Sequence, residues 1–290
     1  MSPSTSHSPT ARSHTGKPVA LVTGAAKRLG LAIAQALAES GHDIALHYRQ
    51  SHDEAEQAAQ QLRAAGAQVA LLRADLTDEA AVQALLPAAV EQLGAVDVLV
   101  NNASSFDYDS PDSFGWACFT QLMQANCAAP VALAQALHRH LQARGPAAQG
   151  CVVNLLDQKL WNPNPDYFSY TLSKAALESA TTLLAMSMAP QLRVCGVAPG
   201  VTLVSGPMDE AEFERAHRLT PLQRSSTPQD IARTVRFLVE SPAITGTTVL
   251  VDGGQHLSGQ ARDVLFLARD MAPAPRTGPA PSPPHLGNAP

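Results

Sequence analysis

The chain has 290 residues, of which 45% are hydrophobic and 16% are charged, and its formal net charge is −5. This composition is typical of a globular protein with a sizeable core. The small negative charge argues against a nucleic-acid or anionic-membrane surface as partner. No apolar run reaches the roughly 18 residues that a membrane span requires.

Short apolar runs rich in β-branched residues alternate with segments of helical periodicity from Pro18 to about Leu257. We expect strands at 18–24, 43–48, 68–75, 96–103, 151–157, 192–200 and 247–254, and helices at 29–40, 53–66, 78–94, 112–144 and 167–189. Segment 201–220 breaks this rhythm and is expected to be a loop with a short helix. The alternation predicts right-handed βαβ units, and hence an α/β Rossmann-type, doubly wound parallel sheet of about seven strands with helices on both faces.

Composition also divides the chain into three parts. Residues 1–17 are rich in Ser, Thr and His without the apolar core of a secretory signal, and 261–290 are Pro-rich after a short apolar piece. We expect a single domain over 18–260 between a disordered leader and a disordered tail.

The four cysteines, Cys118, Cys127, Cys151 and Cys195, form no CxxC pair and lie in apolar or small-residue segments. Free thiols in a reducing compartment, the cytoplasm, are therefore expected rather than disulfides or metal ligands.

The segment Thr23–Gly30 connects the first strand to the first helix. Gly24 and Gly30 allow the tight turn and close approach that a dinucleotide pyrophosphate needs at a helix N-terminus. An ordinary strand–helix connection is the alternative. Arg28 stands among these glycines, where a guanidinium can pair with a phosphate or an anionic substrate group.

The end of the second strand indicates which dinucleotide is bound. It reads His47, Tyr48, Arg49, Gln50, Ser51. No carboxylate that would bind a ribose hydroxyl appears before Asp53, and Arg49 is available for a 2′-phosphate. NADP is therefore favoured over NAD, the alternative being that Arg49 is a solvated loop charge.

Tyr170 and Lys174 are four residues apart, so on a helix they share one face. A phenol beside a cation can donate or accept a proton near neutral pH, because the cation stabilises the phenolate. Such a pair is common by chance, but other marker residues lie at the ends of predicted strands, where ligands bind in open α/β sheets. These are Asn101, Asn102, Ala103, Ser104, Asp157, Pro199 and Gly200, with Asn126 in a helix upstream.

Together these motifs resemble the short-chain dehydrogenase/reductase family over about Pro18 to Leu257. By that resemblance Asn126, Tyr170 and Lys174 are catalytic. The sequence departs from the family at three places: Arg28 replaces the middle glycine of TGxxxGxG, Asp157 stands where a serine is usual, and Ser104 replaces the glycine of NNAG.

Within the family, TGAAKRLG, LHY, NNASSF, Asp157 and the VDGG ending resemble pteridine reductases and dihydromonapterin reductases. An Asp at that position suits a ring nitrogen that must gain a proton, whereas it would repel a developing alkoxide. The resemblance implies an NADPH-dependent reductase of a pterin such as dihydromonapterin or dihydrobiopterin, with dihydrofolate as a further substrate. A strand-end carboxylate that caps the next turn is the alternative for Asp157.

The resemblance also assigns the binding residues. The substrate residues are expected to be Arg28, Ser104, Phe106 (stacked on the pterin), Asp157, Tyr170 and Leu203, with Met208 nearby. The cofactor residues are expected to be Gly24, Arg28, Leu29, Gly30, His47, Tyr48, Arg49, Gln50, Ser51, Asp75, Leu76, Asn102, Ala103, Ser104, Tyr170, Lys174, Pro199 and Gly200.

Two other functions stay open from the sequence. One is an NADPH-dependent carbonyl or 3-oxoacyl reductase, and the other is a non-catalytic NADP-binding sensor or scaffold. The family resemblance further implies a homotetramer that packs through the helices predicted at 112–144 and 167–189.

Overall fold

The computed structural model describes residues 16–204 and 208–271. Nearly all of the predicted leader and the predicted tail from residue 272 onward lie outside these ranges. Seven parallel strands form one sheet in the order β3-β2-β1-β4-β5-β6-β7, which confirms the predicted Rossmann-type fold. The strands are β1 (Val19–Val22), β2 (Asp43–Tyr48), β3 (Val69–Arg73), β4 (Val98–Asn101), β5 (Gly150–Leu155), β6 (Leu192–Pro199) and β7 (Thr248–Val251).

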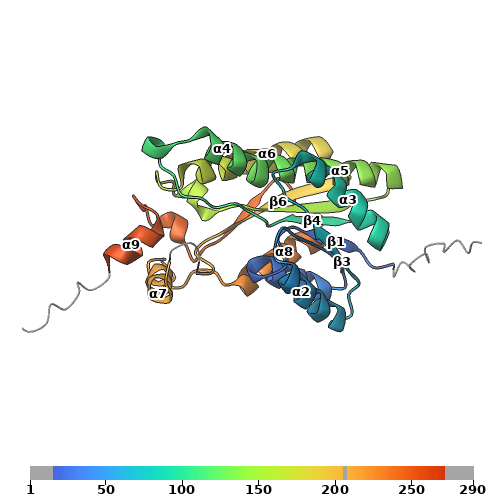
Figure 1. Ribbon diagram of the computed structural model, residues 1–290, viewed down its shortest axis with the longest axis horizontal. Coiled ribbons are helices and arrows are strands. Elements are labelled where there is room, and N and C mark those ends of the chain that lie inside the picture. Colours follow the sequence, from blue (N-terminus) through green and yellow to red (C-terminus); the bar gives the residue numbers. More distant parts are fainter. Residues whose placement is uncertain (1–15, 205–207, 272–290) are drawn as a thin grey trace, which may run out of the picture.

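Helices cover both faces of the sheet (Figure 1). One face carries α1 (Arg28–Glu39), α2 (His52–Ala64) and α8 (Pro228–Glu240). The other carries α3 (Glu79–Leu93), α5 (Ala129–Arg144) and α6 (Phe168–Met188). Because the sheet is covered twice, its strands are largely apolar runs rather than alternations of apolar and polar residues.

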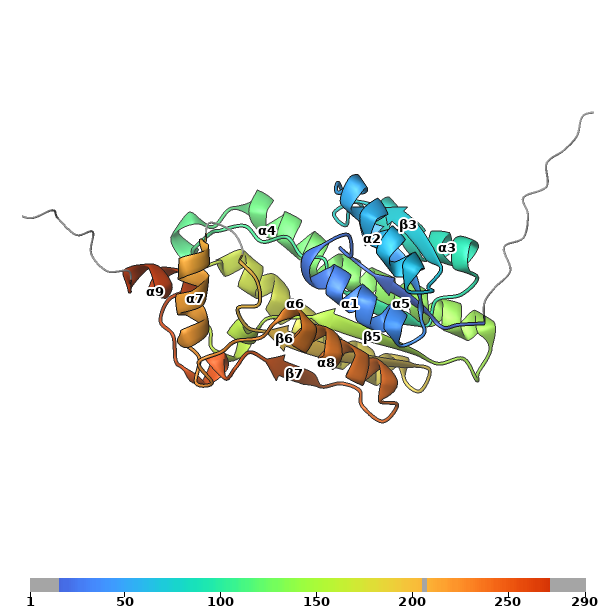
Figure 2. The same ribbon diagram turned by 90° about the horizontal axis from the view of Figure 1, so that it is seen from below.

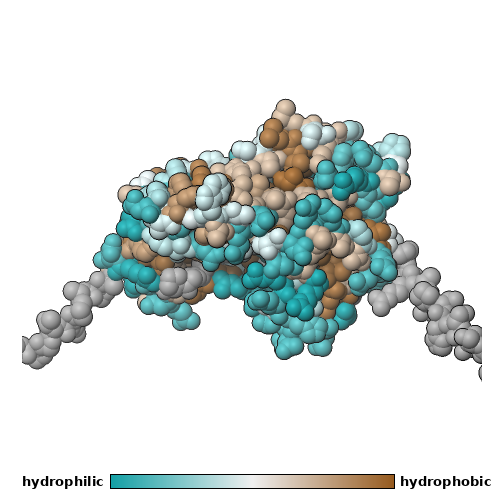
Figure 3. Space-filling model, turned by 45° about the horizontal axis from the view of Figure 1, so that its top comes forward, coloured by the Kyte–Doolittle hydropathy of each residue, from teal (hydrophilic) through white to brown (hydrophobic). Residues whose placement is uncertain are grey.

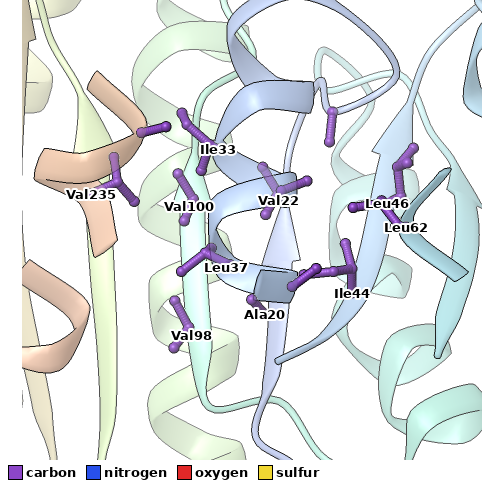
Figure 4. Close-up of a cluster of buried hydrophobic side chains, with 14 of the residues drawn as sticks. Ala20, Val22, Ile33, Leu37, Ile44, Leu46, Leu62, Val98, Val100 and Val235 are labelled. Atoms are coloured by element: carbon purple, nitrogen blue, oxygen red, sulfur yellow. The ribbon is translucent and has the colours of Figure 1, made fainter. Parts of the chain in front are cut away.

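Strand β1 shows how one apolar run serves two cores. Its side chains alternate between the faces, so Ala20 and Val22 pack with Ile33 of α1 on one side (Figure 4). Val19 and Leu21 belong to the core on the opposite side. A polar residue at any of these four positions would therefore be buried in one core or the other.

The sheet order also creates the crevice for the site. The chain goes from β1 outward through β2 to β3, then returns to place β4 on the other side of β1. The loops after β1 and β4 consequently diverge, and ligands of open α/β sheets bind at this switch point.

The single helix predicted over 112–144 is interrupted. A 3₁₀ turn at Pro111–Ser113 is followed by α4 (Trp116–Met123), and a π-helical turn at Gln124–Ala128 separates α4 from α5. Periodicity alone did not reveal this turn because its residues continue the helical path. It matters for the site because it holds Asn126.

Helix α8 was not predicted, although its start signal is present in the sequence. Thr227 accepts a hydrogen bond from the backbone N–H of Asp230 in a capping box, and Pro228 occupies the first turn. Ile231, Val235 and Leu238 then form the buried stripe of an amphipathic helix.

Two short helices close one end of the sheet, α7 (Glu210–Arg218) and α9 (Val264–Asp270), which lie side by side (Figure 2). Val264, Leu265 and Ala268 are buried in a cluster with Met208 and Ala216. The sequence placed α9 in the tail, but residues 264–270 pack against α7. No helix in the described ranges is long and apolar enough to cross a membrane.

Candidate active site

Two glycines shape the loop after β1. Gly24 has a φ of +64°, in the left-handed region that favours glycine. A Cβ at Gly30 would lie 2.2 Å from the carbonyl oxygen of Gly24 and 2.6 Å from Nδ2 of Asn102. No side chain fits there, so the loop closes tightly over the N-terminus of α1. This cradle, with the unpaired N–H groups of a helix N-terminus, fits a dinucleotide pyrophosphate.

His47 fastens this loop to the neighbouring strands. Its Nδ1 accepts a hydrogen bond of 3.1 Å from the N–H of Gly24, so Nε2 carries the hydrogen and donates to the carbonyl of Ala74 at 3.2 Å. Burial lowers the pKa of His47 to about 4, which keeps the ring neutral at pH 7. His47 thus acts on the shape of the phosphate loop through fixed hydrogen bonds.

A cavity of about 620 Å³ opens at the ends of β1, β2 and β4. We call it the dinucleotide cavity. Its walls include most of the predicted cofactor residues, namely Gly24, Arg28, Leu29, Gly30, His47, Arg49, Asp75, Leu76, Asn102, Ala103 and Ser104.

Seven predicted cofactor residues do not line this cavity: four of them, Tyr170, Lys174, Pro199 and Gly200, line the adjoining one, and Tyr48, Gln50 and Ser51 line neither. Successive strand side chains point to opposite faces, so Tyr48 points away from His47, and its hydroxyl lies 2.9 Å from Nδ1 of His52. Gln50 is exposed, and Ser51 directly precedes α2, where the chain has already turned away.

Arg28 lies between the dinucleotide cavity and the adjoining one, and lines both. Its φ is +56°, a left-handed conformation that costs a non-glycine residue about 1 kcal/mol or more. Its Nη2 donates a 2.6 Å hydrogen bond to the carbonyl of Val204, in the segment after β6. The strained residue therefore joins the phosphate loop to the wall of the second cavity.

Asn126 has all its polar atoms occupied within the protein. Its Nδ2 donates to the Ser105 carbonyl at 2.9 Å and to Oγ of Ser173 at 3.0 Å. Its Oδ1 accepts from the N–H of Ser105 at 2.8 Å and from the Ser104 hydroxyl at 3.2 Å. It lines neither cavity, so it positions the segment after β4 against α6, whereas the family resemblance had predicted a catalytic role for it.

Tyr170 and Lys174 meet Asp157 at the end of β5. The hydroxyl of Tyr170 donates to Oδ2 of Asp157 at 2.9 Å, and Oδ1 accepts from the backbone N–H of Lys159 at 2.8 Å. Asp157 therefore caps the next turn and also contacts Tyr170. The two interpretations from the sequence, a turn-capping carboxylate and a group that acts with Tyr170, are compatible. Nζ of Lys174 donates to the Leu155 carbonyl at 2.7 Å and lies 5.8 Å from the centroid of the Tyr170 ring.

The protonation of this cluster is set mainly by burial. Burial and the Asp157 charge raise the pKa of Tyr170 well above its ordinary value, so the phenol is protonated at neutral pH. Burial also raises the pKa of Asp157 and lowers the pKa of Lys174 to about 8. A protonated phenol therefore donates its hydrogen bond to a carboxyl group beside a cation, an arrangement suited to proton transfer.

The second cavity, which we call the substrate cavity, has a volume of about 530 Å³. All six predicted substrate residues line it: Arg28, Ser104, Phe106, Asp157, Tyr170 and Leu203. Lys174, Pro199, Gly200 and Met208 line it as well. Its boundary with the dinucleotide cavity is formed by residues that line both, including Arg28, Ser104 and Phe106.

Phe106 is 41% exposed and packs against two tyrosines. Its ring stacks on Tyr167 with centroids 4.3 Å apart and meets the edge of Tyr170 at 4.7 Å. One face of Phe106 is therefore covered within the protein. Stacking on a flat ligand, as predicted from the sequence, is left to its other face.

Lys159, Asp263 and Gln158 also line the substrate cavity, and none of them was predicted. Lys159 and Gln158 had only their closeness to Asp157 as a signal. Asp263 lies 106 positions after Asp157 (263 − 157), so only the packing of the C-terminal segment places it here. In the described part of the chain, no group of three or more His, Cys, Asp or Glu residues could hold a metal ion.

Comparison with known proteins agrees with this architecture. A family model described as Enoyl-(Acyl carrier protein) reductase, of the short-chain type, matches residues 24–256. Pteridine reductase 1 from Leishmania tarentolae is 35% identical, with 83% of this chain and 97% of that protein covered. The 3-oxoacyl-[acyl-carrier-protein] reductase FabG from Staphylococcus aureus is 31% identical, with 82% and 98% covered.

Among solved structures, FolM Alternative dihydrofolate reductase 1 from Brucella canis, complexed with NADP, superposes with a TM-score of 0.77. It shares 39% identity, and the match covers 83% of this chain and 94% of that one. The motif, the sheet order and these matches converge, and the chain belongs to the short-chain dehydrogenase/reductase family of oxidoreductases.

Proposed function

We propose that this protein is an NADPH-dependent reductase of a pterin ring. The observation that carries the proposal is the 2.9 Å hydrogen bond from the Tyr170 hydroxyl to Asp157, a carboxyl group where a ketone reductase would present a neutral hydroxyl. Phe106, with its exposed ring beside Tyr170, supplies an aromatic surface for a flat substrate. The names of two matched relatives, pteridine reductase and alternative dihydrofolate reductase, support the same substrate class.

NADPH is the cofactor that fits the dinucleotide cavity. Arg49 lines it directly after β2, whereas Lys27 lines it in the loop before α1 and pairs with Glu54 at 3.2 Å. The carboxylate of Asp75 on its wall already accepts hydrogen bonds from Thr77. A cation directly after β2, with no carboxylate among residues 47–51, suits a 2′-phosphate better than a ribose hydroxyl. The NADP of the matched Brucella structure agrees with this choice.

The reaction adds one hydride and one proton across a C=N bond of the ring. When bound, NADPH supplies the hydride and leaves as NADP⁺. The Asp157–Tyr170 pair supplies the proton to the ring nitrogen, because its raised pKa values keep it protonated nearer to neutral pH. Water then returns a proton to the pair, and the Lys174 ammonium stabilises the negative charge that remains there during transfer.

A carbonyl or 3-oxoacyl reductase is the second candidate, favoured by the similarity to FabG. The two candidates differ in what Asp157 does. A carboxylate close to a developing alkoxide raises the barrier, whereas close to a ring nitrogen it lowers the barrier. Replacing Asp157 by serine therefore has opposite effects under the two proposals.

The test is steady-state oxidation of NADPH by purified protein with dihydrobiopterin and, separately, with a 3-oxoacyl thioester. We expect turnover of the dihydropterin, and a loss of about 10²-fold or more in Asp157→Ser. Asp112→Ser, at an exposed position of the 3₁₀ turn, is the matched control and should retain the wild-type rate. Turnover of the thioester alone, retained or improved by Asp157→Ser, would refute pterin reduction.

We further propose a cytoplasmic homotetramer. The free thiols of Cys118, Cys127, Cys151 and Cys195 suit a reducing compartment. Apolar side chains gather on the face formed by α4 and α6, where Trp116 is 76% exposed, Leu183 63% and Met186 76% (Figure 3). A subunit interface across this face would bury them.

A further inference from the structure

One wall of the substrate cavity is strongly polar. Six residues from the segments after β5 and after β7 contribute to it: Gln158, Lys159, Asn164, Gln255, Gln260 and Asp263. We call these residues the polar wall. The proposed proton transfer and ring stacking use Asp157, Tyr170 and Phe106, which leaves the polar wall without an assigned role.

The centre of the polar wall is a buried ion pair. Nζ of Lys159 lies 3.4 Å from Oδ2 of Asp263, and the two side chains are 4% and 20% exposed. The ammonium also donates to the Asp166 carbonyl and lies 5.5 Å from the centroid of the Tyr167 ring. Since an ammonium has three N–H donors, one remains after the hydrogen bonds to Asp263 and to the Asp166 carbonyl within the described residues.

Gln158 adds an unpaired acceptor to this wall. Its side chain is 93% buried (7% exposed), and its Oε1 has no hydrogen-bond partner in the part of the chain that the structure describes. A buried polar atom without a partner is uncommon and costly. This oxygen has almost no accessible surface, so a hydroxyl group of a bound molecule can donate to it only if the side chain turns toward the cavity that Gln158 lines.

We infer that the polar wall binds an uncharged, hydroxyl-bearing substituent of the substrate ring, and that the Lys159–Asp263 pair makes the site discriminate against an anionic substituent. A hydroxyl both donates and accepts, so it matches the amide side chains of Asn164 and Gln260 as well as the remaining N–H of Lys159. A carboxylate only accepts, and Asp263 already offsets the cation that would attract it. The inference rests on the proposed pterin reduction and assigns the specificity of the same cavity.

The wall is also joined directly to the proposed proton donor. The backbone N–H of Lys159 donates to Oδ1 of Asp157 at 2.8 Å, while Oδ2 of the same carboxyl meets Tyr170. A substituent held by Lys159 is therefore held at a fixed offset from the reacting carboxyl group. Recognition of the substituent thus helps to orient the ring nitrogen toward the proton.

The test compares three dihydropterins that share the reducible ring. Dihydrobiopterin carries an uncharged dihydroxypropyl group, dihydrofolate carries an anionic tail, and 6-methyldihydropterin reports on the ring alone. The measured quantity is the kcat/KM for dihydrofolate divided by that for dihydrobiopterin, relative to the same ratio in the wild type. Because each ratio is divided by the wild-type ratio, the difference in size between the two substituents cancels.

The two partners of the ion pair should shift this ratio in opposite directions. Asp263→Asn leaves the Lys159 cation unbalanced and should raise the ratio about tenfold, and Lys159→Gln leaves the carboxylate and should lower it about tenfold. Asparagine at 263 can still cap α9, where the aspartate accepts the N–H of Leu265 at 3.1 Å. Arg262→Gln is the matched control, since Arg262 pairs with Asp166 outside the cavity wall and should leave the ratio unchanged.

Melting temperatures of all variants check that each is folded. Ratios that shift in the same direction, or not at all, overturn the inference, because a purely structural role would not reverse sign. If wild-type protein reduces 6-methyldihydropterin while the ratios stay constant, the inference falls and the proposed function stands. If it reduces none of the three, the proposed function falls and takes this inference with it.

Discussion

The dinucleotide cavity and the substrate cavity adjoin each other but are built differently. The first depends on backbone conformation, through the positive φ of Gly24, the missing side chain of Gly30 and the hydrogen bonds of His47. The second depends on side chains that come together from distant segments, such as Phe106, Asp157 and Asp263. A backbone cradle is encoded locally, whereas a side-chain cavity needs the whole fold. The predictions below therefore test whether changes to the two cavities have separable consequences.

The largest effect is expected on the substrate side. Tyr170→Phe removes the hydroxyl that meets Asp157 but keeps the ring that packs on Phe106, so kcat should fall about 10²–10⁴-fold while NADPH binding persists. Tyr108→Phe is the control, because the Tyr108 ring is 53% exposed and lines neither cavity. Rates within a few-fold of wild type in folded Tyr170→Phe would show that another group provides the proton.

The next effect concerns the histidine behind the dinucleotide cavity. The folded pKa of His47 is about 4 and its unfolded value is about 6.5, so between these values the unfolded chain binds more protons. The contribution of neutral His47 to the free energy of unfolding is fully present above pH 6.5. About 3 kcal/mol of it is lost as the pH falls toward 4. In His47→Asn this loss should be absent. In urea unfolding, the difference in unfolding free energy between wild type and variant should therefore be smaller at pH 4 than at pH 7. Parallel pH curves for the two proteins would contradict the buried, neutral state of His47.

A smaller effect is expected from a single methyl group in the phosphate loop. In Gly30→Ala the Cβ would meet the Gly24 carbonyl at 2.2 Å, and backbone cannot rotate away as a side chain can. We expect a loss of about 2 kcal/mol in unfolding free energy and a weaker affinity for NADPH, measured by fluorescence titration. Gly115→Ala, with nothing within 4 Å of its added Cβ, is the control and should leave the affinity for NADPH unchanged. An unaltered affinity for NADPH in Gly30→Ala would contradict the proposal that this loop binds the pyrophosphate closely.

The smallest effect is expected at Arg28, which belongs to both cavities. Arg28→Gly relieves the strained φ of +56° and should raise the unfolding free energy by about 1 kcal/mol. It also removes the guanidinium that contacts Val204, so the KM values for NADPH and substrate should both rise. Gln223→Gly relieves a similar φ of +51° at an exposed position and should gain stability without loss of activity. Equal kinetics in both variants would mean that the arginine does not couple the cavities.

The sequence predicted best where a feature depends on neighbouring residues. Strand β1, the glycines of the phosphate loop and the Tyr170–Lys174 pair on α6 follow from periodicities of two and 3.6 and from glycine's conformational freedom. The prediction was wrong at two elements. The π-helical turn around Asn126 continues a helical pattern, and α8 was not predicted although the capping box of Thr227 begins it.

By itself, then, the sequence determined the fold, the family and the chemical types present at the strand ends. Only the tertiary structure decided which partners these groups have. Asn126 satisfies all its hydrogen bonds within the protein, Asp157 meets both Tyr170 and Lys159, and Asp263 reaches the substrate cavity through the packing of α9. The reason is physical, because hydrogen bonds and burial depend on distances between residues far apart in the chain, and these distances exist only once the core has formed.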